Sequence, residues 1–336
     1  MREDRMKISI VCPVLNEEEG LPHFQRELSH VLTSLGQYDY EVIFVDDGST
    51  DGSLELLRRW ARSDPRMRYV SLSRNFGVQA AFFAGMEHAE GDAIILMDAD
   101  LQHPPAVIPE LVRSWESGHD VVITLRNEWR RSGFRRFASR CFSRLLRRLS
   151  PMHTRENISD FCLLSRRAVA DLLRMRETHR WLRGLIQWLG YSMGEVTYTP
   201  AARNYGRTKF TLSRLFGYSF DALLSFSRAP LRLAAGMGTV CFLLGLGIVG
   251  RGLLAVLGPS WHVDPAMICL LASIYLVGGA VLFSIGLVGE YVGRIFEQVK
   301  DRPLYLLRET EKQARGIRAR PEQPEWDAVE RQRRGA

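Results

Sequence analysis

Two long uncharged apolar runs do most to limit what this chain can fold into. They cover residues 233–250 and 266–289, and each reaches the roughly 18 residues that a membrane-spanning helix needs. A buried helical hairpin in a globular core is the alternative. The second run, however, contains scattered glycines, which membrane helices tolerate and soluble helices penalise. We therefore expect a two-helix transmembrane hairpin over residues 231–293.

Basic residues on either side of this hairpin indicate its orientation. Arginines and lysines flank both ends, whereas the connecting loop holds only Arg251. The flanking residues are Arg203, Arg207, Lys209, Arg214 and Arg228 before the hairpin, and Arg294, Lys300, Arg302 and Arg308 after it. Because basic residues favour the cytoplasmic side, we expect a multi-pass protein of the cytoplasmic membrane with both termini in the cytoplasm. Five cysteines without a C-x-x-C spacing fit free thiols in that reducing compartment.

Short β-rich apolar runs alternate with helical patterns before the hairpin. The runs cover residues 7–14, 40–47, 67–73, 92–100 and 119–126. Strands and helices in this alternation predict an α/β domain with a mainly parallel sheet and helices on both faces. The hydrophobic content of 46% over 336 residues is enough to bury such a core and excludes a largely disordered chain. Ligands bind beyond the carboxyl ends of the strands in sheets of this kind.

Acidic loops follow three of the predicted strands. They read PVLNEEEG, DDGSTDG and DADLQHPP. Asp47 or Asp51, taken singly, fits a helix cap as well as a ligand-binding role. Asp98 and Asp100 are more informative, because two carboxylates this close repel each other unless a cation neutralises them. Oxygen ligands of this kind suit Mg²⁺ or Mn²⁺, which also bridge phosphates.

The motifs, taken in order, resemble a known family. PVLNEE, VDDGSTDGS, LSRNFG, MDADLQHPP, SDFCLLSRRAV, RGLIQWLGY and RNYGRTKF, followed by two membrane spans, are similar to the family 2 glycosyltransferases that load sugars onto polyprenyl phosphate. The resemblance runs from about residue 7 to residue 309 and implies the GT-A nucleotide-sugar-binding fold. It divides the chain into a catalytic domain (1–205), a juxtamembrane amphipathic segment (206–230), the hairpin (231–293) and a cytoplasmic tail (294–336), which we expect to be disordered from about Thr310.

The resemblance also assigns roles to the acidic loops. Pro13, Glu17 and Asp46 or Asp47 would hold the base and ribose of the donor. Asp98, Asp100 and Gln102 would hold a divalent metal and the donor diphosphate. His103 stands where relatives commonly have Asp, and we expect a solvated turn residue there rather than a metal ligand.

Three further residues take roles in handling the acceptor. Asp160 matches the aspartate often proposed as the catalytic base. The acceptor phosphate has a second pKa of about 6 and needs little deprotonation, so positioning the substrate, or a capping role in the fold, remain alternatives for Asp160. Arg203 and Lys209 would contact phosphate in the site, with binding of lipid headgroups as the alternative.

A helix expected over about residues 130–149 carries a ladder of arginines. Arg136, Arg140, Arg144 and Arg148 share one face, while apolar residues share another. Like charges at this spacing destabilise an isolated helix, so an anionic partner is required. Anionic membrane lipid is the simplest partner, and the membrane spans on the same chain argue against nucleic acid.

The function implied is an inverting transfer of a sugar from a nucleotide-sugar, with UDP favoured and GDP open, to polyprenyl phosphate for the cell envelope. A processive membrane polysaccharide synthase is one alternative, although the Q-x-x-R-W motif of those enzymes is absent from GLIQWLGY. A catalytically silent membrane scaffold with the same fold is another. Formation of a homo-oligomer also remains open.

Overall fold

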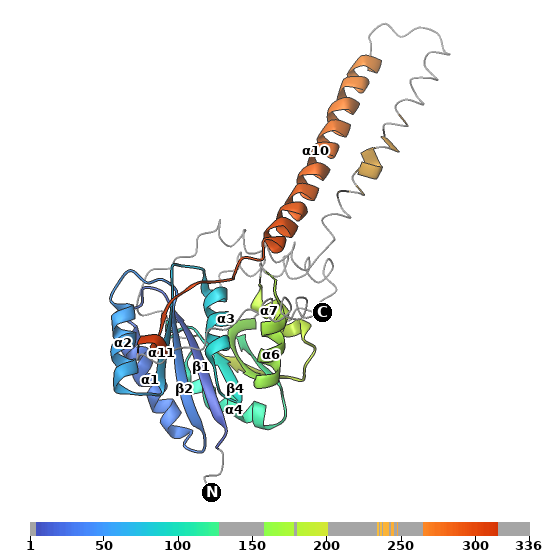
Figure 1. Cartoon of the computed structure of the whole chain (residues 1–336). Coiled ribbons are helices and arrows are strands. Elements are labelled where there is room, and N and C mark those ends of the chain that lie inside the picture. Colours follow the sequence, from blue (N-terminus) through green and yellow to red (C-terminus); the bar gives the residue numbers. More distant parts are fainter. Residues whose placement is uncertain are drawn as a thin grey trace, which may run out of the picture.

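The computed structural model describes residues 5–127, 158–177, 180–200 and 265–314, with scattered positions between 234 and 247. A sheet with helices on both faces forms the globular part, and one long helix projects from it (Figure 1). The strands are β1 (Lys7–Val14), β2 (Asp39–Asp46), β3 (Met67–Leu72), β4 (Ala93–Leu96), β5 (Val121–Arg126), β6 (Ile158–Ser165), β7 (Met193–Tyr198) and β8 (Leu307–Thr310). The helices are α1 (Leu21–Ser34), α2 (Ser53–Ser63), α3 (Val78–His88), the 3₁₀ turn η1 (Pro105–Val107), α4 (Ile108–Glu116), α6 (Arg166–Arg174), α7 (Leu182–Trp188), α10 (Pro265–Val299) and α11 (Glu311–Ala314).

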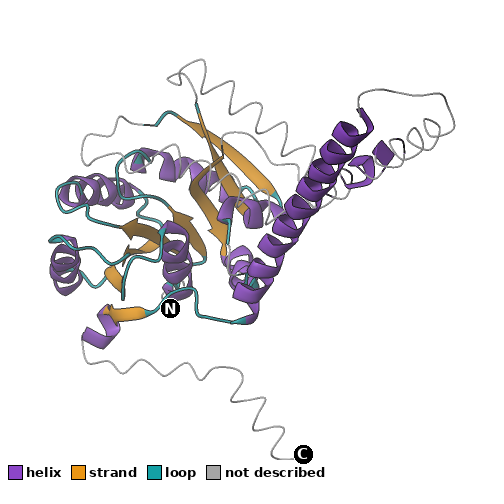
Figure 2. Ribbon diagram, turned by 90° about the horizontal axis from the view of Figure 1, so that it is seen from above, coloured by secondary structure: helices purple, strands orange, loops and turns teal. Residues whose placement is uncertain are grey.

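The eight described strands form one sheet in the order β7-β5-β6-β4-β1-β2-β3-β8. Figure 2 shows strands of this sheet in orange, seen from above, with the long helix projecting to one side. β6 and β8 run antiparallel to their neighbours, and the other six strands are parallel to one another. The mainly parallel α/β sheet expected from the sequence is confirmed, and each of the five apolar runs overlaps one of β1 to β5. β6, β7 and β8 complete the sheet at positions for which no strand was predicted.

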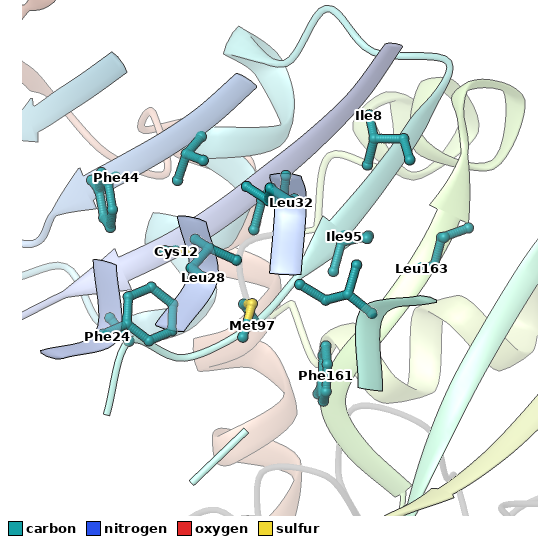
Figure 3. Close-up of a cluster of buried hydrophobic side chains, with 14 of the residues drawn as sticks. Ile8, Cys12, Phe24, Leu28, Leu32, Phe44, Ile95, Met97, Phe161 and Leu163 are labelled. Atoms are coloured by element: carbon teal, nitrogen blue, oxygen red, sulfur yellow. The ribbon is translucent and has the colours of Figure 1, made fainter. Parts of the chain in front are cut away.

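Alternating side chains of the strands build a hydrophobic cluster on each face of the sheet. In β1, Ile10 and Cys12 join the cluster that α1, α2 and α4 cover, whereas Val11 joins the cluster beneath α3, α6 and α7. Figure 3 shows the first cluster, where Phe24 of α1 packs edge-on to Phe44 of β2 with the ring centroids 6.4 Å apart. Burial on both faces fixes the register of the central strands, because a slip by one residue would turn apolar side chains away from their cluster.

α10 is the one helix in the described part of the chain that is long and apolar enough to cross a membrane, over Leu276–Val299. At about 1.5 Å per residue its 35 residues extend roughly 52 Å, which exceeds a hydrocarbon core of about 30 Å. Its apolar side chains face outward, with Leu282 72% exposed. The first apolar run lies mostly outside the described residues, and its described positions between 234 and 247 are helical. The two-span hairpin therefore stays a prediction.

The chain returns from α10 to the sheet. Gln298, near the end of α10, donates to the Arg176 carbonyl at 2.6 Å, and β8 then pairs antiparallel with β3. The Ser73 amide donates to the Leu306 carbonyl at 2.8 Å, and Arg58 of α2 pairs with Glu309 at 2.7 Å. The expected disorder from about Thr310 is wrong at its start, because Thr310 closes β8 and α11 follows it. Residues 315–336 lie outside the described part.

Candidate active site

Loops of different origin meet at one edge of the sheet. The carboxyl ends of the parallel strands β1, β2, β4, β5 and β7 lie there, and so does the amino end of the antiparallel strand β6. This is the edge at which doubly wound sheets bind ligands. Asp98 and Asp100 follow β4, and Asp160 lies near the start of β6, so the antiparallel strand brings a residue distant in sequence to the D-x-D loop.

The two carboxylates of the D-x-D loop are half-buried, and its middle residue is fully buried. Ala99 is 2% exposed, whereas the Asp98 side chain is 31% exposed. Gln102 donates its main-chain N–H to Asp100 Oδ1 at 3.0 Å. Burial, followed by the negative charges of Asp100 and Asp160, raises the pKa of Asp98 to about 7. Such a pair of carboxylates is stabilised by a cation.

The donor set fits a divalent metal that is shared with a phosphate ligand. The described residues hold no group of three or more His, Cys, Asp or Glu side chains that could bind a metal ion. Two carboxylates completed by phosphate oxygens and water are nevertheless a common arrangement for Mg²⁺. Asp98 and Asp100 would then hold Mg²⁺ or Mn²⁺ only together with a diphosphate, and Gln102 would lie beside them.

His103 is not the solvated turn residue expected from the sequence. Its side chain is fully buried, and its Nδ1 accepts a hydrogen bond from the Asp98 main-chain N–H at 2.9 Å. Its Nε2 lies 3.0 Å from Ser159 Oγ and 3.1 Å from an Arg126 nitrogen. Burial, then the positive charge of Arg126, lowers the pKa of His103 to about 3, so the ring is neutral. The prediction was wrong because the aromatic pocket that receives the ring comes from β6 and β7.

Asp160 is held by an arginine. Arg183 of α7 donates from Nε to Asp160 Oδ1 at 2.8 Å and from Nη2 to Oδ2 at 2.6 Å. The Asp160 side chain is 14% exposed and that of Arg183 is 34% exposed. Burial would raise the pKa of Asp160, but the charge and hydrogen bonds of Arg183 outweigh it and hold the pKa below its usual range. Asp160 is therefore an oriented, ionised carboxylate beside the D-x-D loop.

The two aspartates after β2 are buried and shape loops. Asp46, which is 0% exposed, accepts from the Ser49 N–H at 3.0 Å and from Ser71 Oγ at 2.8 Å. Asp47, which is 3% exposed, accepts from the N–H groups of Phe76 and Gly77 at 2.7 and 2.9 Å. Both carboxylates thus fix the loops after β2 and β3. Binding of base and ribose at this position stays a prediction.

The loop after β1 is tied to the loop after β2. Pro13 is buried at the end of β1. Glu17 donates its main-chain N–H to Ser53 Oγ at 3.0 Å, and Asn16 Oδ1 accepts from the Thr50 N–H at 2.8 Å. Asp51 accepts from the N–H of Ser53, the first residue of α2, at 3.0 Å. The N-cap of α2 is Gly52, so Asp51 is not the helix cap that the sequence offered as one alternative. The two loops form one cross-linked platform at the sheet edge.

Several predicted residues lie outside the described part of the chain. These are Arg203, Lys209, the arginine ladder over 130–149 and the segment 206–230. The described part of the site contains two arginines whose roles the sequence did not predict, Arg126 and Arg183. Arg126 ends β5, and a basic residue at the carboxyl end of a parallel strand was a usable signal. Arg183 precedes the GLIQW motif, and only its pairing with Asp160 discloses its role.

Known proteins and families are similar to this chain over most of its length. Residues 9–173 match Glycosyl transferase family 2, and residues 229–295 match the GtrB C-terminal hairpin. The chain is 36% identical over 310 residues to the SfII prophage-derived bactoprenol glucosyl transferase of Shigella flexneri, covering 91% of this chain and 98% of the relative. It is 36% identical over 312 residues to a prophage bactoprenol glucosyl transferase homolog of Escherichia coli K12, covering 91% and 100%.

Among solved structures, glucosyl-3-phosphoglycerate synthase from Mycobacterium tuberculosis is similar over 66% of this chain and 79% of its own, with 22% identity and a TM-score of 0.46. The family match and the two near full-length relatives establish the relationship. The chain is a glycosyltransferase that belongs to glycosyl transferase family 2, in the polyprenyl-phosphate sugar transferase group.

Proposed function

We propose that this protein transfers one sugar from a nucleotide-sugar to polyprenyl phosphate with inversion at the anomeric carbon, and that the product serves modification of the cell envelope. The observation that carries the proposal is the D-x-D loop beside the Asp160–Arg183 pair, in a chain that aligns with 98% of a bactoprenol glucosyl transferase. Bactoprenol is a polyprenol, and the name of that relative makes UDP-glucose the first donor to test.

The donor side of the site is assigned to the D-x-D loop and the platform beside it. Asp98, Asp100 and Gln102 would hold Mg²⁺ or Mn²⁺ with the diphosphate, and the metal would offset the negative charge that develops on the leaving group. Pro13 and Glu17 belong to the cross-linked platform, and the rigidity of that platform supports a role in receiving the base and ribose. The resemblance to this family favours UDP as the donor nucleotide.

The acceptor phosphate has to be positioned, and it hardly needs a base to deprotonate it. A phosphate monoester with a second pKa of about 6 is mostly ionised near neutral pH. Its oxygen forms the new bond to the anomeric carbon, while the bond from that carbon to the diphosphate oxygen breaks and the nucleoside diphosphate leaves. Asp160 is already ionised and accepts two hydrogen bonds from Arg183. These observations favour a role for Asp160 in positioning the sugar or the acceptor.

The membrane side of the proposal rests on α10 and on the basic segments. α10 is a candidate span, and its C-terminal end is tied to the catalytic domain through Gln298 and β8. Arg203 and Lys209 would add positive charge for the two phosphate groups that meet in the site, and the arginine ladder would bind anionic lipid. A lipid phosphate could then reach the site without leaving the bilayer.

The proposal is tested with purified protein in detergent. Undecaprenyl phosphate, Mg²⁺ or Mn²⁺ and a panel of UDP- and GDP-sugars are incubated together, and release of the nucleoside diphosphate is measured. We expect release that requires both the lipid phosphate and the metal. Release at the same rate without lipid phosphate would contradict the assigned acceptor.

Two other functions were open from the sequence. A processive polysaccharide synthase would add many sugars to one acceptor, and a silent scaffold would bind nucleotide without releasing a diphosphate. The match over nearly the full length of bactoprenol glucosyl transferases supports single transfer over both. The size of the product and the release assay distinguish the three.

A further inference from the structure

The buried ring of His103 connects the D-x-D loop to the ends of three strands. Ser159 near the start of β6, Arg126 at the end of β5 and Tyr198 at the end of β7 surround its Nε2 side. Ser159 Oγ lies 3.0 Å from both His103 Nε2 and the Tyr198 hydroxyl. Arg126 Nε donates to the Tyr198 hydroxyl at 3.0 Å and to Ser159 Oγ at 3.3 Å.

The ring binds the main chain of the metal-binding loop directly. Nδ1 accepts the N–H of Asp98 at 2.9 Å, so Nδ1 carries no proton itself. The ring proton lies on Nε2, which is 3.0 Å from Ser159 Oγ. An asparagine or glutamine in place of His103 could supply an acceptor on one side of this pocket only. The position of the Asp98 backbone is thus set by a side chain five residues further along the chain.

Two aromatic rings fix the plane of the imidazole. Phe161 stacks on His103 with ring centroids 5.2 Å apart and an interplanar angle of 20°, and Tyr198 lies edge-on at 6.0 Å and 78°. Phe161 is fully buried and Tyr198 is 4% exposed. A ring held on its face and at its edge cannot rotate freely about its side-chain torsion, so the Nδ1 acceptor remains directed at Asp98.

We propose that His103 is a positioning residue that holds the D-x-D loop in the geometry that binds the divalent metal. The proposal rests on the proposed function, because it assumes that Asp98 and Asp100 bind a metal with the donor diphosphate. Partners that orient the ligands of a metal change its affinity by about 10- to 100-fold when they are replaced. His103 contacts no metal in this role and acts through the main chain of Asp98.

A matched pair of variants separates this role from simple packing. His103→Asn keeps an acceptor close to the position of Nδ1, whereas His103→Gln places its amide nearer to the position of Nε2. The Kd of Mn²⁺ is measured by electron paramagnetic resonance of the free ion, in the presence of the nucleoside diphosphate that the transfer assay identifies. We expect His103→Asn to bind Mn²⁺ within about threefold of wild type, and His103→Gln to bind it about tenfold or more weakly.

Two controls complete the design. Tyr198→Phe removes a hydroxyl from the same cluster without touching the Nδ1 acceptor, so its Kd for Mn²⁺ is expected to match that of the wild type even if its Tm falls. Asp98→Asn is expected to abolish Mn²⁺ binding. Equal Kd values for His103→Asn and His103→Gln would overturn the role of His103, whereas wild-type protein that binds no Mn²⁺ would instead refute the metal site of the proposed function.

Discussion

Asp160 and Arg183 form the most closely bound ion pair at the site. Both carboxylate oxygens accept from one guanidinium, and a bidentate pair of this kind fixes direction as well as charge. The guanidinium keeps the pKa of Asp160 below its usual range in spite of burial. A carboxylate in this state is a poor proton acceptor near neutral pH, which favours the positioning role over that of a base.

Removal of the arginine changes the pH dependence of the reaction. In the wild type Asp160 is ionised throughout the range from pH 5 to pH 8, so we expect no loss of transfer rate from its protonation there. In Arg183→Ala, the largest interaction that opposes burial is lost, so the pKa of Asp160 rises. We therefore expect a rate that is about 10- to 100-fold lower at pH 7 and that rises as the pH is increased toward 8.

The measurement is the pH profile of kcat for both proteins. Arg167→Ala is the matched control, because Arg167 also pairs with an aspartate, Asp120, at 2.7 Å, but its side chain is 65% exposed. A profile of Arg183→Ala that is parallel to that of the wild type would contradict the assigned role of the pair.

The strands differ in whether their own sequence predicts them or whether they depend on pairing with distant residues. β1 to β5 were predictable because each is an apolar run bounded by loop residues. β8 reads LRET, with one apolar residue, and becomes a strand by pairing with β3, more than 230 residues earlier. β7, MGEVTY, alternates in burial along its length, and such a short pattern fits a loop equally well.

The site residues also fall into those that the local sequence predicts and those that it does not. Asp98 and Asp100 were predictable because a pair of carboxylates after an apolar run has few structural explanations. The roles of His103 and Arg183 were not, since they depend on Phe161, Ser159 and Asp160, which the antiparallel strand β6 brings to the D-x-D loop from more than 50 residues away. The residues next to His103 and Arg183 in the sequence do not indicate these long-range contacts.

β8 is expected to depend on the ion pair between Arg58 and Glu309. Their side chains are 29% and 27% exposed, so the pair is more protected than a surface pair. Arg58→Glu should loosen β8 through repulsion, and hydrogen exchange of the amides of 307–310 should become several-fold faster. The charge-reversed double variant Arg58→Glu with Glu309→Arg should restore the slow exchange. Unchanged exchange in the single variant would show that main-chain pairing alone holds β8.

A cluster of charged side chains lies at the edge of the sheet opposite the site and connects parts of the chain that are distant in sequence. Glu41 of β2 accepts from Ser9 Oγ at 2.6 Å and from Arg68 at 2.5 Å. Arg68 also lies 3.5 Å from Glu311 of α11, and Glu90 pairs with Lys312 at 3.0 Å. The cluster thus connects the central strands to the segment that follows α10.

Because of this cluster, we expect the folded protein to lose stability at acidic pH. Despite burial, hydrogen bonds from Ser9, Glu90 and Arg68 lower the pKa of Glu41, while Lys312, Arg68 and Lys7 lower that of Glu90 to about 2. Because both pKa values are lowered from the usual 4.5, the stabilisation is complete above about pH 4.5 and is lost as the pH falls below that, with the contribution of Glu90 lost toward pH 2. The Tm of Glu90→Gln should be lower than that of the wild type at pH 7 and should fall less steeply in acid.

Thermal unfolding of the wild type and Glu90→Gln in detergent, at several values between pH 7 and pH 2.5, measures this effect. Glu110→Gln, at an exposed position of α4 outside the cluster, is the control and should follow the wild type. If Glu90→Gln and the wild type lose the same number of degrees between pH 7 and pH 2.5, the cluster does not supply the pH dependence.

The membrane topology can be read from the reactivity of single introduced cysteines. Because β8 pairs with β3, we expect Arg59 on α2 and Arg302 after α10 to lie on the same side of the membrane. Arg59→Cys and Arg302→Cys should react with an impermeant maleimide only after spheroplasts are permeabilised. Ser260→Cys, between the two apolar runs, should react in intact spheroplasts if the hairpin spans twice. Equal protection of all three sites would exclude that hairpin.

The most direct measurement is the mass of the lipid product made by wild type and by Asp98→Asn, using undecaprenyl phosphate, Mn²⁺ and the donor found by the release assay. Wild type should add one sugar residue to the lipid phosphate and no more. Asp98→Asn, with an unchanged Tm, should form it at least about 100-fold more slowly. A lipid that carries several sugars, or nucleotide released with no sugar on the lipid, would contradict single transfer to polyprenyl phosphate.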